Sequence, residues 1–96
     1  MSYTFTLEPG LLEAELKKLI LAEADKEDEI AIADFTDDAV LFGDESPISL
    51  DSLDALQIAV ALQQYFQVRL QGDRMVRKHM SNVRSLAAFV RKEHGA

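Results

Sequence analysis

The sequence of 96 residues contains no cysteine, which excludes disulfides, thiolate metal sites and a cysteine nucleophile. It has no apolar run near membrane-spanning length, and residues 1–10 lack the basic and apolar regions of a signal peptide. We therefore expect a cytoplasmic protein that does not bind membranes. Hydrophobic residues nonetheless make up 48% of the chain, which is enough to build the core of one small domain spanning residues 1–96.

Basic residues are few, because 10 Lys and Arg stand against 17 Asp and Glu and leave a net charge of −7. Such a charge argues against a general nucleic-acid binder. The charges are also unevenly divided: residues 1–54 hold 15 acids and 3 lysines, net −12, whereas residues 55–96 hold 2 acids and 7 bases, net +5. The two halves can therefore pair within the molecule or face two kinds of partner.

Apolar spacing predicts an all-α fold of three main helices and one short helix around a single core. The four expected helices cover residues 10–26, 51 or 52 to 67, 73–80, and 81 or 82 to 94. Within the first, Glu13 and Lys17 are four residues apart in the order that favours an ion pair. The side chains expected to face the core are Leu12, Leu16, Leu19, Ile20, Leu53, Leu56, Ala59, Val60, Leu62, Phe66, Met75, Val76, Met80, Val83, Leu86, Ala87 and Val90.

Two segments carry apolar residues without a helical period. Residues 1–9 look like an N-terminal arm, in which apolar and polar residues alternate as in a strand. Residues 27–50 are expected to form a long loop that its apolar side chains hold against the core. Within this loop we expect a short turn near residues 37–42 and another at residues 43–47.

Several residues that carry chemistry in other proteins lack the required pattern here. His79 and His94 have no Cys or His companion at ligand spacing, so we expect two surface histidines near helix ends. The bases have no interleaved aromatics, and nothing marks a pocket with paired carboxylates, so we expect neither a nucleic-acid partner nor an enzyme. The acids of the long loop do not have the spacing of a calcium-binding loop, and no metal site is expected. These acids are Asp34, Asp37, Asp38, Asp44 and Glu45.

The segment Asp51-Ser52-Leu53-Asp54 stands at the start of the most apolar helix. Capping of that helix would by itself account for its acids and its serine. A serine at a helix N-terminus is also well placed to carry a phosphodiester, because free N–H groups and the helix dipole favour the phosphate. We expect the Ser52 hydroxyl to be exposed.

Together with its surroundings, this segment resembles the acyl carrier protein family, in which Asp-Ser-Leu heads the second helix. The resemblance covers about residues 11–92 and includes the long first loop. It implies the four-helix bundle of that family. The matching segments are Leu50–Leu56, Ala61-Leu62, Phe66, Val68-Arg69-Leu70 and Val83–Val90.

By this resemblance, Ser52 would carry a 4′-phosphopantetheine arm, installed from coenzyme A with Mg²⁺ by a phosphopantetheinyl transferase. The thiol of the arm would hold acyl groups as thioesters and present them to biosynthetic enzymes such as acyl ligases, ketosynthases, ketoreductases and dehydratases. The chain itself would be a monomeric carrier with no catalytic residues. The residues that could line a site for the acyl chain are Leu53, Leu56, Ala59, Met75, Met80 and Val83, although for each of them a place in the plain core is the favoured interpretation.

The chain also departs from the family pattern. The departures are Ser49 in place of a frequent Gly, Gln57, Gln63 and Gln64 in place of Glu, and the bases Arg74, Arg77 and Lys78 in a segment that is usually acidic. They predict weak docking to enzymes that read an acidic second helix, and hence a specialised carrier that works with a dedicated set of enzymes. The sequences of the second helix and of residues 85–90 resemble those of stand-alone bacterial carriers of polyketide or aryl-polyene pathways. Docking is expected at Asp51, Leu53, Asp54, Gln57, Arg74 and Arg77. The alternative is an unmodified helical module that binds proteins directly.

Overall fold

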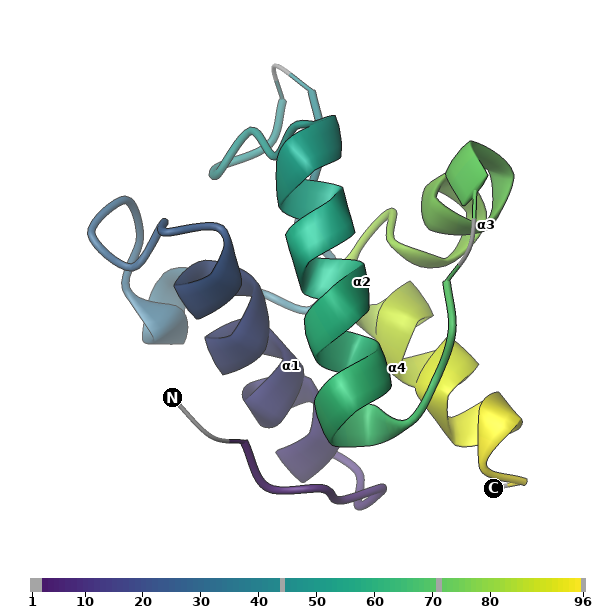
Figure 1. Ribbon diagram of the computed structural model, residues 1–96. Helices are drawn as coiled ribbons and strands as arrows, with labels where there is room; N and C mark the ends of the chain where they lie inside the picture. The colour runs from purple at the N-terminus through teal and green to yellow at the C-terminus, as the bar shows by residue number, and fades with distance from the viewer. Residues whose placement is uncertain (1–2, 44, 71, 96) are drawn as a thin grey trace.

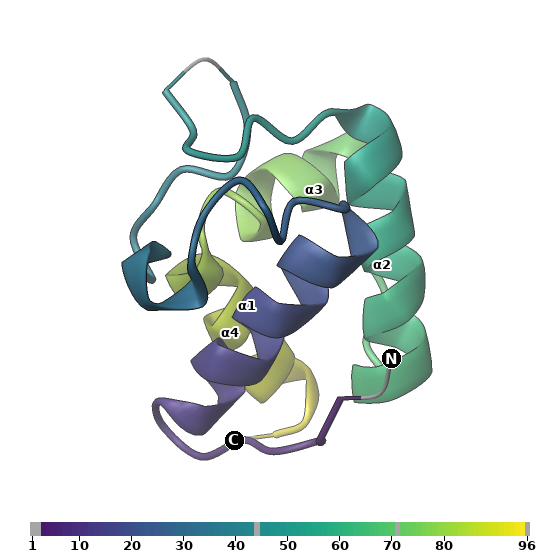
Figure 2. The same cartoon turned by 90° about the vertical axis from the view of Figure 1, so that its left-hand side faces the viewer.

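The computed structural model describes residues 3–43, 45–70 and 72–95. Within these residues the elements are α1 (Leu11–Glu23), the short 3₁₀ helix η1 (Ile32–Asp34), α2 (Ser52–Phe66), α3 (Gly72–His79) and α4 (Val83–Glu93). Helix α1 packs against α2 and α4, and α3 packs against α4 (Figure 1). The predicted all-α four-helix bundle is thus confirmed, and Figure 2 shows the long loop that joins α1 to α2.

Helix α1 begins and packs as its sequence predicts. Gly10 precedes it with a φ of +84°, a conformation that glycine adopts at little cost. The backbone N–H of Gly10 donates a hydrogen bond of 2.9 Å to the carboxylate of Glu13, which satisfies one free group at the helix start. The apolar stripe is fully buried and consists of Leu12, Leu16, Leu19 and Ile20.

Helix α2 buries only part of the face that was expected, because Leu62 and Phe66 are buried as predicted but three other residues are not. Leu53, Leu56 and Val60 were predicted to face the core, but they are 61%, 61% and 58% exposed. The residues that α2 does bury are Ala55, Ile58, Ala61, Leu62 and Phe66. Because α2 is apolar on most sides, its periodicity allows two stripes, and packing against α1 selects the one that contains Ile58.

The long loop is held against the core, as predicted, by the buried side chains of Phe35, Leu41, Ile48 and Leu50. Its two turns lie where they were expected. The backbone N–H of Ala39 donates to Thr36 at 3.3 Å, and that of Ser46 donates to Gly43 at 3.2 Å. Asp44, within the second turn, lies outside the described residues. The 3₁₀ helix at Ile32–Asp34 was not predicted.

Some acids of the first half of the chain form ion pairs with bases of the second half. The guanidinium of Arg84 lies 2.7 Å from Asp38, and that of Arg91 lies 3.0 Å from Glu13. Both pairs join a base of the second half of the chain to an acid of the first half. The Glu13–Lys17 pair expected within α1 gives way to tertiary contacts, because Lys17 instead lies 2.7 Å from Asp37 in the long loop.

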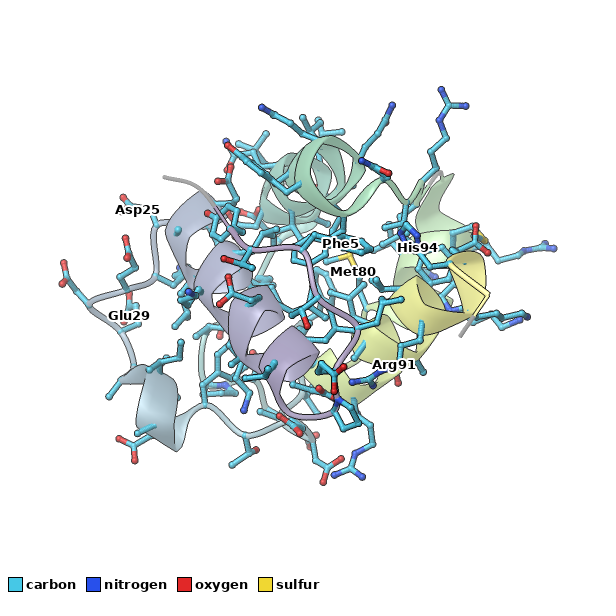
Figure 3. The ribbon with its side chains drawn as sticks, turned by 90° about the horizontal axis from the view of Figure 1, so that it is seen from below. Phe5, Asp25, Glu29, Met80, Arg91 and His94 are labelled. Atoms are coloured by element: carbon cyan, nitrogen blue, oxygen red, sulfur yellow. The ribbon has the colours of Figure 1, made fainter. Side chains whose placement is uncertain are left out.

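The N-terminal arm packs across the bundle as an irregular segment. Tyr3 is 9% exposed, and its ring meets that of Tyr65 edge-on at 4.9 Å. Phe5 meets the ring of His94 at 4.8 Å (Figure 3). Arg91 donates hydrogen bonds to two carbonyl oxygens of the arm. These contacts tie the arm to the end of the bundle where α2 and α4 finish (Figure 1).

The two histidines stand at helix ends, as expected, but they are half-buried and not simple surface residues. His79, the last residue of α3, stacks on Phe89 with ring centroids 4.3 Å apart. Burial lowers the pKa of its imidazole, and the charge of the adjacent lysine lowers it further. His94, which follows α4, has its Nε2 atom 2.6 Å from the carbonyl oxygen of Phe66. The His79 ring therefore joins α3 to α4, and the His94 ring joins the end of α4 to the end of α2.

Candidate functional site

Ser52 is the first residue of α2 and is exposed, as the sequence predicts. Within the described part of the chain, no hydrogen bond involves its hydroxyl. The first turn of a helix presents unpaired N–H groups and the positive end of the helix dipole. Ser52 thus combines a free hydroxyl with an electrostatic setting that suits an attached phosphate.

The side chain of Asp51 caps the helix, so the hydroxyl of Ser52 is not needed as a cap. The carboxylate of Asp51 accepts the backbone N–H of Asp54 at 2.9 Å, and the carboxylate of Asp54 accepts the backbone N–H of Asp51 at 3.1 Å. This reciprocal pair is a capping box. The hydrogen bond from Asp54 lowers the pKa of the Asp51 carboxyl, so this acid stays charged beside Ser52 well below neutral pH.

Ser49, which stands where the family often has glycine, lies in a left-handed turn just before α2. Ser49 has a φ of +44°, in the left-handed region where glycine is favoured. This explains why glycine suits the position and why a serine there needs support. The support comes from Ser46, whose hydroxyl accepts the backbone N–H of Ser49 at 2.9 Å. Ser46 was not predicted from the sequence, although the Ser-Pro-Ile-Ser pattern is typical of a turn in which a serine hydroxyl bonds the backbone.

An open apolar groove of about 780 Å³ begins beside Ser52. It lies between α2, α3 and the long loop. Of the residues predicted to line such a site, Leu56 and Ala59 do, whereas Met80 and Val83 are completely buried in the core. The apolar lining that the sequence did not predict comes from the loop, from α2 at Ala55 and from the segment around α3. It consists of Val40, Phe42, Leu50, Ala55, Leu70 and Val76.

Two further predicted lining residues lie elsewhere. Leu53 is exposed one residue after Ser52 and is not among the residues that line the groove. Met75 is only partly buried and packs against the core. At both positions the lining alternative was wrong, and for Met75 the favoured core interpretation agrees with its packing. Periodicity along one helix does not reveal where a distant loop folds back.

Only two of the residues predicted to dock partners line this groove. Asp51 and Arg77 line the groove together with Ser52, although they come from different helices or their flanks. Gln57 is exposed on α2, and Arg74 is exposed on α3. The structure therefore brings one acid and one base to the same groove.

Neither a metal site nor a membrane-spanning helix is present among the described residues. Nowhere in that part of the chain do three or more His, Asp or Glu side chains gather in a way that could hold a metal ion. No helix within the described ranges is long and apolar enough to cross a membrane.

Comparison with known proteins identifies the class of site. Residues 18–90 match the family described as "Phosphopantetheine attachment site". The match starts within α1, ends within α4, and includes the groove and Ser52. No curated protein matches the chain. The chain therefore belongs to the phosphopantetheine attachment family, acyl-carrier-type proteins that carry a covalently bound 4′-phosphopantetheine.

Proposed function

We propose that the chain is an acyl carrier protein whose 4′-phosphopantetheine is attached to Ser52. The observation that carries this proposal is the state of the serine hydroxyls in the matched region. Ser46 is buried, Ser49 donates to the carbonyl of Ser46 at 3.3 Å, and Ser81 donates to Ser85 at 3.2 Å. Among these serines, Ser52 has the exposed hydroxyl that no described hydrogen bond engages.

The proposed modification is a group transfer at the Ser52 oxygen. A phosphopantetheinyl transferase with Mg²⁺ would bring coenzyme A to the start of α2. The Ser52 oxygen would attack the phosphorus next to the pantetheine. The bond from oxygen to phosphorus forms, the pyrophosphate bond of coenzyme A breaks, and 3′,5′-ADP leaves. The transferase must accept the hydroxyl proton, because no His or Lys stands beside Ser52 in its motif.

The groove supports a role in carrying acyl chains. Its walls are mainly apolar, and it begins at Ser52 and extends past Leu56 and Ala59 of α2 to Val76 of α3. An acyl chain on the arm would remove apolar surface from water if it lay in this groove, at about 0.8 kcal/mol for each buried CH₂. The thiol of the arm, and not a residue of the chain, would hold the cargo as a thioester.

The partner enzymes would dock at the end of the bundle that carries Ser52. We assign this docking to Asp51, Leu53, Asp54, Gln57, Arg74 and Arg77. A helix α2 with glutamine at position 57 and a basic α3 suits a dedicated set of enzymes of the polyketide or aryl-polyene type. The whole chain, residues 1–96, would act as one monomeric domain in the cytoplasm.

The test is to incubate the purified chain with coenzyme A, Mg²⁺ and a broad-specificity phosphopantetheinyl transferase, and to measure the intact mass. The expected result is a gain of one phosphopantetheine by the native chain and none by Ser52→Ala. Ser85→Ala is the matched control, because it removes a serine on α4 and should still be modified. An unchanged native mass with several transferases would contradict the proposal and favour the unmodified interaction module.

A further inference from the structure

Ser46 holds together the loop that leads to α2. Of the polar side chains in the described residues, it is the one that is buried, with 7% of its surface exposed. Its hydroxyl donates to the carbonyl of Leu41 at 2.9 Å and accepts the backbone N–H groups of Ile48 at 3.1 Å and Ser49 at 2.9 Å. One donated and two accepted bonds are the full capacity of a hydroxyl.

The turn that Ser46 supports is one that a serine adopts reluctantly. At a φ of +44°, the β-carbon of Ser49 crowds its own backbone, which glycine would avoid. The Ser49 hydroxyl returns a 3.3 Å hydrogen bond to the carbonyl of Ser46, so the two serines brace each other. The chain then returns to the core, where the N–H of Leu50 bonds the carbonyl of Leu41 at 2.9 Å.

This turn sets the direction in which the start of α2 leaves the loop. Leu50 is buried, and Asp51 immediately caps the helix, so little freedom remains between the turn and Ser52. Loss of the turn would allow the Ser52 hydroxyl to adopt several orientations. An enzyme that must place this hydroxyl against a phosphorus atom would then bear the cost of ordering it.

We propose that Ser46 is a positioning residue for the modification of Ser52. The inference rests on the proposed attachment at Ser52. Because Ser46 is buried, it acts through Ser49 and touches neither the transferase nor coenzyme A. Ser46 thereby holds Ser49 in the left-handed backbone conformation that glycine would adopt without support.

The test compares kcat/KM for transfer from coenzyme A among variants of the full chain. Ser46→Ala should lower kcat/KM by roughly tenfold, because Ser49 loses the acceptor of its N–H. The double variant Ser46→Ala with Ser49→Gly should recover most of the rate, because glycine holds the left-handed turn without support. Val90→Ala is the control for stability alone. Val90 is buried in the second half of α4, and Figure 1 shows that this end of α4 is far from the start of α2. Its truncation should lower Tm but not kcat/KM.

A second variant guards against failure of Ser46→Ala to fold. Ser49 is exposed, so Ser49→Val leaves the core intact while placing a β-branched residue where φ must be positive. It should slow the transfer as Ser46→Ala does. Unchanged kcat/KM in both variants, or a double variant no faster than Ser46→Ala, would overturn the positioning role while the attachment at Ser52 stood. A native chain that gains no mass would overturn both.

Discussion

The carboxylates of Asp51 and Asp54 each accept the backbone N–H of the other residue, at 2.9 Å for the N–H of Asp54 and 3.1 Å for that of Asp51. The two acids that flank Ser52 therefore hold the start of α2 in shape. They are also the acids to which we assign partner docking. Their structural and electrostatic contributions must be separated by substitutions that change one without the other.

Asp51→Asn and Asp51→Ala make this separation. Asparagine keeps an oxygen that can cap the helix and removes the charge, whereas alanine removes both. We expect Asp51→Asn to keep Tm within about 2 °C of the native value and Asp51→Ala to lower it by several degrees. Both should slow modification by the transferase at low salt, because the charge that attracts the partner is lost. A rate for Asp51→Asn equal to the native rate at low salt would show that the charge does not guide docking.

The Arg91–Glu13 pair should make stability depend on pH in the acid range. The hydrogen bond from Arg91 holds the pKa of Glu13 below its usual value of 4.5. A lowered pKa means that the unfolded chain binds the proton more readily than the folded chain. The contribution is therefore complete above about pH 4.5 and is lost as the pH falls through the lower folded value.

Arg91→Ala should lower the free energy of unfolding at pH 7 by about 1–2 kcal/mol, because it also frees two carbonyls of the arm. Urea unfolding at pH 7 and pH 3 gives the measurement, and the loss on acidification should be smaller in Arg91→Ala than in the native protein. Arg91 donates two hydrogen bonds of 3.0 Å to the two carboxylate oxygens of Glu13. Arg91→Lys keeps the charge without this paired geometry, so its loss on acidification should lie between those of the native protein and Arg91→Ala. An equal loss on acidification in all three proteins would contradict the pairing.

The N-terminal arm should contribute to stability although it lies before the matched region. Tyr3 is almost buried, its ring contacts Tyr65, and its hydroxyl donates to Glu23 at 3.1 Å. We expect Tyr3→Ala to cost about 2–3 kcal/mol of unfolding free energy, and Tyr3→Phe to cost about 1 kcal/mol. Thr4→Ala changes an exposed neighbour and is the control. Denaturant midpoints that are equal for Tyr3→Ala and Thr4→Ala would show that the arm is dispensable.

The groove should stabilise an acylated chain. Ala59 is half-buried on its wall, so Ala59→Phe would fill the space between α2 and α3 without disturbing the buried face of α2. A native chain loaded with an eight-carbon acyl group should melt several degrees above the unloaded form, whereas Ala59→Phe should show little difference. Ala88→Phe adds the same ring at an exposed position of α4 and should keep the native difference. The idea fails if Ala59→Phe also keeps it.

The glutamines of α2 should limit docking to enzymes that read an acidic helix. Gln57 and Gln64 are exposed, so replacing both by glutamate adds charge without affecting the core. We expect acylation by a fatty-acid ketosynthase to rise by roughly threefold to tenfold at low salt and the gain to shrink as salt increases. Ala88→Glu on α4 serves as the control for added charge at a distant site. An unchanged rate in the double variant would rule out the charge explanation.

Local sequence patterns predicted what depends on near neighbours. Helix α1 has one apolar stripe and therefore one possible buried face. Asn82 caps α4 by accepting the N–H of Ser85 at 2.8 Å, and Asp51 caps α2, each within three residues of its partner. The same local rules identified Ser52 as an exposed serine at a helix start. They failed for part of α2, where Leu56 and Ile58 are both apolar and only the tertiary packing distinguishes the exposed residue from the buried one.

Residues a few positions apart specify the four α-helices, the long apolar loop and the position of the proposed attachment serine, and they narrow the caps of α2 and α4 to two adjacent residues each. Only the tertiary contacts show that the loop joins α3 in forming the groove and that Arg91 binds the arm. These features join segments distant along the chain. Their geometry depends on how the whole core closes, and periodicity along one helix carries no information about that closure.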